Sequence, residues 1–222
     1  MKTKLILTFL SLSSAAAFAP FAAAAAPAKE AACCVEAPPA APAAASACCA
    51  EEKPTAPVGA RSLYQLGTKW TDDSGAPVRL VSLHGQPVIL AMFFASCEYA
   101  CPLLVSDIQR VRAALPAELR ARTRVVLVSF DTARDTPAAL KAYRERLELD
   151  ANWTLLRGDA DSVQELAMLL GVKFKREANG QFAHSNLITL LSPGGEIAHQ
   201  RAGLQGDVSE LTKAVVEISR TK

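Results

Sequence analysis

The stretch VILAMFFASCEYACPLL, residues 88–104, decides the fold and carries the most informative chemistry of the chain. Residues 88–95 are apolar without polar alternation, which predicts a β-strand covered on both faces. Pro102 suits the first turn of a helix, so we expect a helix to begin there. Cys97 and Cys101 therefore lie where a buried strand passes into a helix.

The other elements are predicted from apolar runs, helix caps and turn residues. Strands are expected from residue 78 to the Gly-Gln-Pro turn at 85–87, over 124–131, over 153–158, and as a hairpin over 185–203 with Pro193-Gly194-Gly195 at its tip. Helices are expected over 134–149, 161–171 and 207–220, with Asp135 or Thr136 capping the first and Asp207 capping the last.

Strands that alternate with helices, followed by a hairpin and a helix, predict an α/β fold. We expect a mixed central sheet with helices on both faces, which is the layout of a thioredoxin-like domain, and assign it to residues 59–222. In open α/β sheets, ligands bind outside the carboxyl ends of the strands. Cys97 and Cys101 occupy that place after the first long strand.

The N-terminus has a basic tip, an apolar stretch and a run of alanines, which predicts a secretory signal peptide over residues 1–26. An uncleaved inner-membrane anchor is the alternative. Removing Lys2 and Lys4 leaves 22 of the 24 basic residues against 22 acidic ones, and aromatic residues are only 6% of the chain, so nucleic-acid binding is disfavoured. Export places the six cysteines in an oxidising compartment, the periplasm.

Residues 27–58 are rich in alanine and proline and are expected to be a disordered tether. This tether contains two adjacent cysteine pairs, Cys33-Cys34 and Cys48-Cys49. Three roles are open for them: disulfides between the pairs, capture of a soft metal such as Cu(I) by auxiliary thiolate ligands, or a redox relay.

The CxxxC spacing of Cys97 and Cys101 allows more than one chemistry. On a helical turn, positions i and i+4 share one face, with Cα atoms about 6 Å apart. That separation permits a disulfide, so the cysteines are a candidate redox-active pair, and it equally lets both sulfurs bind one ion. A helix N-terminus also stabilises thiolate over thiol. Two sulfurs leave a soft ion under-coordinated, so a metal site needs a third ligand.

The chain has three histidines. His84 lies in a turn and His199 on the second arm of the predicted hairpin, where structural or solvated roles suffice. His184 is expected in the loop that enters the hairpin's first strand, where thioredoxins place a cis-proline and this chain has no proline. Because that loop packs over the cysteine motif in the thioredoxin layout, His184 is the predicted third ligand.

Three blocks, PVILAMFFASCEYACPLLVSDIQRV, VVLVSFDTARDTPAALKAY and FAHSNLITLLSPGGEI, resemble in order and spacing the signatures of the Sco/SenC family. The resemblance covers residues 60–222 and implies a thioredoxin-fold copper chaperone that helps assemble the binuclear copper centre of cytochrome c oxidase. It implies Cys97, Cys101 and His184 as copper ligands, and Asp131 as a residue that supports the ligands or docks a partner.

Three features depart from the family pattern. Glu98 stands where the family has proline, Ile188 stands where it commonly has an aromatic residue, and a predicted signal peptide replaces the usual anchor. The ligand trio itself is intact.

The predicted function is that of a periplasmic copper chaperone, not an enzyme, whose partner is the copper subunit of cytochrome c oxidase or another periplasmic copper protein. Two thiolates and one imidazole suit Cu(I) and also accommodate Cu(II). The alternatives are a thiol-disulfide oxidoreductase that reduces a partner's cysteines, itself served by a thioredoxin-like reductant, and a module that senses redox or copper status. A peroxiredoxin is disfavoured because Phe94 stands where its motif has threonine.

Overall fold

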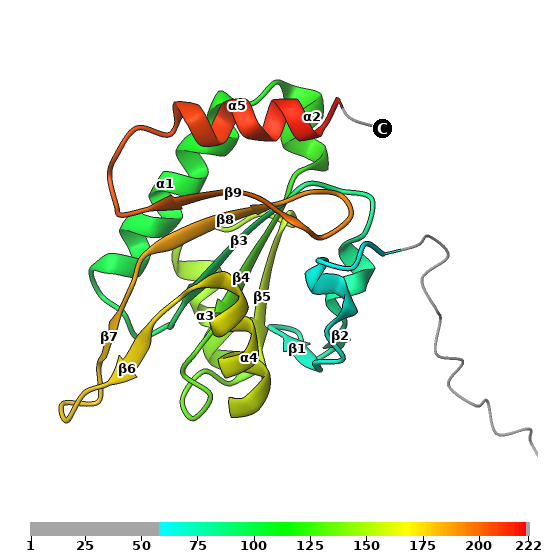
Figure 1. Ribbon diagram of the computed structural model, residues 1–222. Coiled ribbons are helices and arrows are strands. Elements are labelled where there is room, and N and C mark those ends of the chain that lie inside the picture. Colours follow the sequence, from blue (N-terminus) through cyan, green and yellow to red (C-terminus); the bar gives the residue numbers. More distant parts are fainter. Residues whose placement is uncertain (1–57, 221–222) are drawn as a thin grey trace, which may run out of the picture. The chain divides into compact units, whose positions relative to one another are not determined.

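The computed structural model describes residues 58–220, which contain a seven-stranded sheet of order β2-β1-β5-β4-β3-β8-β9 (Figure 1). β3 pairs in parallel with β4, and β4 with β5, whereas β8 runs antiparallel to β3. The strands are β1 (Trp70–Asp72), β2 (Pro77–Val78), β3 (Val88–Phe93), β4 (Arg124–Ser129), β5 (Trp153–Arg157), β8 (Leu187–Leu191) and β9 (Ile197–Ala202). The predicted mixed α/β sheet is confirmed.

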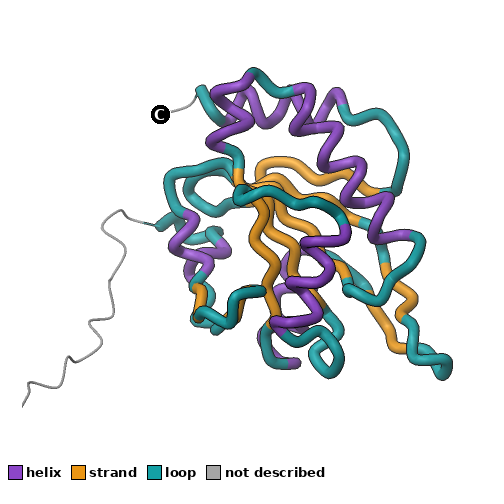
Figure 2. The backbone as a smooth tube through the Cα atoms, turned by 180° about the vertical axis from the view of Figure 1, so that it is seen from behind, coloured by secondary structure: helices purple, strands orange, loops and turns teal. Residues whose placement is uncertain are grey.

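Helices cover both faces of this sheet (Figures 1 and 2). β3, β4 and β5 follow one another in the same direction, so right-handed crossovers place α1 (Ala100–Ala114) and α3 (Pro137–Arg146) on one face. After β5 the chain crosses back towards β8, and α4 (Ala160–Leu170), which lies in this connection, covers the other face. α5 (Ser209–Ile218) packs on α1, β8 and β9, and α2 (Ala117–Arg122) follows α1.

The central strands form the core. Every residue of β3 is buried, as is every residue of β4 after Arg124. An apolar run without alternation therefore predicts this strand correctly, because helices and neighbouring elements cover both of its faces. The carboxyl end of β3, at Phe93, is the point from which the chain enters the cysteine motif.

The predicted helix boundaries hold with small shifts. Thr136 is the N-cap of α3 and its side chain accepts the amide of Ala139, whereas the other candidate cap, Asp135, has a different role described below. α1 begins at Ala100, slightly before the predicted start at Pro102. Asp207 lies one residue before the N-cap of α5, and its carboxylate accepts the amide and hydroxyl of Ser209.

Two local predictions are wrong. Residues after Val78 were expected to continue as a strand, but Leu80–Leu83 form a 3-10 helix, η2, because Leu80 and Leu83 are both buried at the three-residue repeat of that helix. His184 was expected in a loop, but it ends strand β7 (Phe182–His184), which pairs with β6 (Phe174–Arg176) in a separate two-stranded sheet.

Several predictions lie outside the described residues: the signal peptide, most of the tether, and Cys33, Cys34, Cys48 and Cys49. Within residues 58–220, the helices are too short or too polar to cross a membrane. The first described residues join the fold at the β8–β9 turn, where the amide of Leu63 donates to the carbonyl of Gly195 at 2.9 Å.

Candidate metal site

Cys97, Cys101 and His184 converge in the structure. Their ligand atoms all lie within 4.8 Å of one another, close enough to surround a single ion. Among residues 58–220, no other group of three or more histidine, cysteine or acidic side chains is arranged in this way. The structure therefore brings together the three residues that the sequence indicates as ligands, and their role in binding a metal stays a prediction.

The two cysteines are positioned by the transition from β3 to α1. Cys97 lies in the turn after the strand, and Cys101 lies in the first turn of the helix, where its amide points towards the Cys97 sulfur at 3.3 Å. Cys101 is completely buried and Cys97 is 7% exposed. The sulfurs are not bonded to each other, so the structure shows the dithiol form.

The two thiols have opposite proton affinities. The pKa of Cys97 is lowered, chiefly by the hydrogen bond from Cys101 and also by one from His184, against the opposing effect of burial. The pKa of Cys101 is raised by its hydrogen bond to Cys97 and by its burial. Cys97 is therefore the thiolate of the reduced pair, and a metal that binds both sulfurs must displace the proton held by Cys101.

His184 reaches the sulfurs from the end of β7. Its ring lies edge-on to Phe94, at 5.8 Å and 90°, and tilted against Phe130 at 5.2 Å. Its Nδ1 lies 3.3 Å from the carbonyl oxygen of Ser185. When a metal is bound, the tautomer protonated at Nδ1 can donate to that carbonyl and offer Nε2 to the ion, in place of the hydrogen bond that the ring donates to Cys97 in the metal-free pair.

Of the two aspartates after β4, Asp135 is the one tied to the cysteine loop. Its Oδ2 accepts the amide of Ala95 at 2.9 Å and the hydroxyl of Ser129, and burial raises its pKa. Asp131 is also buried, and it forms an ion pair with Arg134. Its predicted role in supporting the ligands or docking a partner stays a prediction. Sequence reasoning missed Asp135, which the pattern SFDTARD presents only as a candidate helix cap.

The site opens to the surface beside Cys97. A hollow of about 460 Å³ is lined there by Ala95, Ser96, Cys97, Glu98, Pro102 and Arg146. Tyr99, the residue after Glu98, is 76% exposed. Glu98 thus lines the approach to the thiolate of Cys97. The opening gives a partner's ligands access from the Cys97 side.

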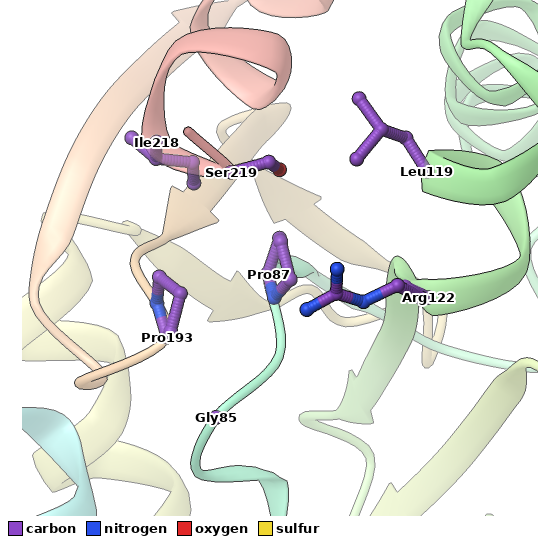
Figure 3. Close-up of a pocket in the computed structure, with 7 residues that line it drawn as sticks. All are labelled: Gly85, Pro87, Leu119, Arg122, Pro193, Ile218 and Ser219. Carbon is purple, nitrogen blue, oxygen red and sulfur yellow. The ribbon is translucent and has the colours of Figure 1, made fainter. Parts of the chain in front are cut away.

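The other two histidines lie elsewhere. His84 caps the C-terminal end of η2, with its ring 6.3 Å from that of Tyr64, and His199 is partly exposed on β9. A second hollow, of about 270 Å³, is lined by Pro87 and Pro193 among others (Figure 3). Because Pro87 precedes β3 and Pro193 follows β8, this hollow lies at the opposite end of the strands from Cys97.

The fold and the site together define a thioredoxin-like domain with a ligand set suited to a soft metal at the end of its central strand. The family model described as SCO1/SenC matches residues 62–219. The chain therefore belongs to the SCO1/SenC family.

Known proteins show the same relationship. A Stutzerimonas stutzeri protein named as a candidate copper-binding protein is 33% identical over 141 residues, which cover 61% of this chain and 68% of that protein. The structure of Arabidopsis thaliana ScoI with copper bound matches with a TM-score of 0.59 and 23% identity, over 70% of this chain and 97% of that one. BsSco, titled a member of the Sco family of cytochrome c oxidase assembly proteins, matches with a TM-score of 0.60 and 23% identity, over 69% and 92%. These structural likenesses show a shared fold.

Proposed function

We propose that this protein is a periplasmic copper chaperone that delivers copper to the binuclear copper centre of cytochrome c oxidase. The observation that carries the proposal is the convergence of Cys97, Cys101 and His184 within 4.8 Å. Two sulfurs and an imidazole suit Cu(I) and accommodate Cu(II), whereas Mg²⁺ and Ca²⁺ prefer oxygen ligands. The copper-bound relative and the family's named link to oxidase assembly support the same function.

Copper is the cargo of this site, and the geometry suits its transfer. Three protein ligands leave coordination room, and the hollow beside Cys97 admits ligands from another protein. A partner's thiolates or imidazoles can then replace the ligands one at a time, so the ion is never released into water. Oxidation of the two thiolates to a disulfide removes the sulfur ligands, and copper retention therefore depends on a reducing supply of electrons.

The proposed location rests on the N-terminal sequence. Residues 1–26 have the pattern of a signal peptide, which would direct the protein to the periplasm. An oxidising compartment would convert the reduced pair to a disulfide, so a thioredoxin-like reductant is the second partner we propose.

A second candidate function is thiol-disulfide exchange, favoured by the lowered pKa of Cys97 beside the protonated Cys101. In that reaction the two cysteines pass two electrons to a partner's disulfide and become a disulfide themselves. The third candidate, a sensor of redox or copper status, uses the same chemistry with a signalling partner. His184 separates metal delivery from exchange, because an imidazole ligand is needed only for the metal.

His184→Ala is expected to lower the Cu(I) affinity of the reduced protein by at least about tenfold, or about 1.4 kcal/mol. Copper transfer to the metal-free copper domain of oxidase subunit II should fall in parallel, while reduction of a small disulfide substrate persists. The control is His199→Ala, which removes a partly exposed histidine on β9. Its Cu(I) affinity and copper transfer should equal those of wild type. Unchanged copper binding and transfer in His184→Ala would favour the oxidoreductase instead.

The tail cysteines are tested by stoichiometry. We propose that Cys33, Cys34, Cys48 and Cys49 hold auxiliary Cu(I), because four thiolates in an alanine- and proline-rich segment have no core to staple. The reduced mature protein should then bind more Cu(I) per chain than a protein beginning at Gly59, by inductively coupled plasma analysis after gel filtration. A four-serine variant of the full chain should match the shorter protein. Equal copper content in all three would overturn the auxiliary copper role and leave disulfides or a redox relay.

A further inference from the structure

Four phenylalanines form a connected cluster beside the imidazole of His184. Phe94 follows β3, Phe130 follows β4, and Phe174 and Phe182 lie on β6 and β7. Phe130 stacks on Phe174 at 5.0 Å and 13°, and contacts Phe182 at 5.1 Å, which in turn lies 5.3 Å from Phe94. The imidazole contacts Phe94 and Phe130 directly. We call these four side chains the phenylalanine cluster.

The phenylalanine cluster is what joins the β6–β7 hairpin to the rest of the fold near the metal site. The two strands pair only with each other, with Phe174 opposite His184 and Arg176 opposite Phe182. Two-stranded hairpins of this length are marginal on their own and need packing against other elements. The rings of Phe174 and Phe182 supply that packing by lying against the rings at the ends of β3 and β4.

The alternation of side chains along a strand explains this arrangement. Phe182 and His184 are two residues apart on β7, so they point to the same face of the hairpin. Phe174, directly opposite His184, and Arg176 share that face, whereas Lys175 and the exposed Ala183 belong to the other. The face that carries the phenylalanines is therefore also the face that carries the ligand.

We infer that Phe174 and Phe182 are positioning residues for copper binding: they hold the β6–β7 hairpin so that His184 stays against the two sulfurs. This inference rests on the proposed function. Neither ring is a metal ligand, so each acts on the copper affinity only through His184. The ring of Phe94, which contacts Phe182, lies edge-on to the imidazole and restricts its rotation, because aromatic side chains prefer such edge-to-face contacts.

The test uses Phe174→Leu and Phe182→Leu in the full chain, because Phe174 and Phe182 are only half-buried and leucine keeps part of the apolar contact. Each variant is expected to bind Cu(I) about tenfold more weakly in competition with a Cu(I) chelator, the lower end of the usual range for residues that orient a metal ligand, and no more weakly than His184→Ala, because each ring acts only through His184. Tyr64→Leu is the matched control, since it removes a buried aromatic ring next to Gly195, at the other end of the sheet. Its Cu(I) affinity should equal that of wild type.

A double-variant cycle separates positioning from general destabilisation. In a His184→Ala background, Phe174→Leu should lower the affinity no further, because the residue through which it acts is gone. If Phe174→Leu lowered the Cu(I) affinity equally with and without His184, the inference would be overturned. It would also be overturned if the wild type bound copper and both leucine variants bound it with unchanged affinity.

A readout without metal keeps the inference independent of the proposed function. In the metal-free reduced protein, the side-chain proton resonances of His184 should be displaced by the surrounding rings and should move towards free-histidine values in Phe174→Leu. If the His184 resonances are displaced but the protein binds no copper, the proposed function is contradicted and the positioning role of the rings stands. Resonances identical in wild type and Phe174→Leu would overturn the positioning role.

Discussion

A Cys101→Ser variant is expected to bind Cu(I) at least about a hundredfold more weakly than the wild type, a loss of about 2.7 kcal/mol. Cys101 is fully buried and its sulfur lies within 4.8 Å of the other two ligand atoms, so no other described histidine, cysteine or acidic side chain is placed to replace it. Cu(I) prefers thiolate to imidazole, and losing a sulfur should therefore cost more than losing His184. Competition with a Cu(I) chelator under anaerobic conditions measures the affinity.

Ser129→Ala is a useful comparison for that experiment. It also removes a buried polar atom near the site, the hydroxyl that donates to Asp135, but it leaves all three ligands in place. Its Cu(I) affinity should stay far closer to wild type than that of Cys101→Ser, with circular dichroism confirming that both variants fold. Full retention of one tightly bound copper per core domain in Cys101→Ser would refute the three-ligand site.

The second large effect concerns the pH dependence of thiol reactivity in the reduced, metal-free protein. The hydrogen bonds from Cys101 and His184 lower the pKa of Cys97. The thiolate of Cys97 should therefore persist at pH values at which an ordinary cysteine is protonated. The alkylation rate of Cys97 should therefore change little between pH 5 and 7, whereas an ordinary thiol with a pKa of about 8.5 becomes about a hundredfold more reactive over that interval. Cys101, whose pKa is raised, should stay protonated and unmodified.

Iodoacetamide labelling followed by peptide mapping follows each cysteine separately. Glutathione in the same tube serves as the ordinary thiol, and a Cys97→Ser variant should lose the pH-independent reaction. A Cys97 rate that rises about tenfold per pH unit, as for an unperturbed thiol, would show that Cys97 is protonated in the reduced pair.

The sequence predicts the central sheet well because its strongest patterns are set by burial. The uninterrupted apolar run at 88–95 and the run beginning at Val125 are doubly covered strands, and Pro137 and Gly171 mark helix ends where the structure has them. The short stretch after Val78 is different, because an apolar run of a few residues fits a strand and a 3-10 helix equally well. Only burial of Leu80 and Leu83 together distinguishes the two.

For the site, the cysteine spacing and the position of His184 identify the three converging side chains, but not how the histidine is held. The Asn179-Gly180 pair is a hairpin signal present in the sequence, and Gly180 has a φ of 79° in the turn between β6 and β7. The phenylalanine cluster and the contact of Asp135 with Ala95 join residues far apart in the chain. Such contacts depend on tertiary packing, which no local pattern encodes.

The three residues of the candidate site are far apart along the chain, because β8, which pairs antiparallel with β3, comes late in the sequence. Cys97 and Cys101 follow β3, whereas His184 arrives only with the segment that leads into β8. A chain that is complete only as far as α4, without β7, presents a bare dithiol that oxidants can close. We therefore expect acquisition of copper by all three residues to follow completion of the sheet, and the cysteines of an incomplete chain to need protection until then.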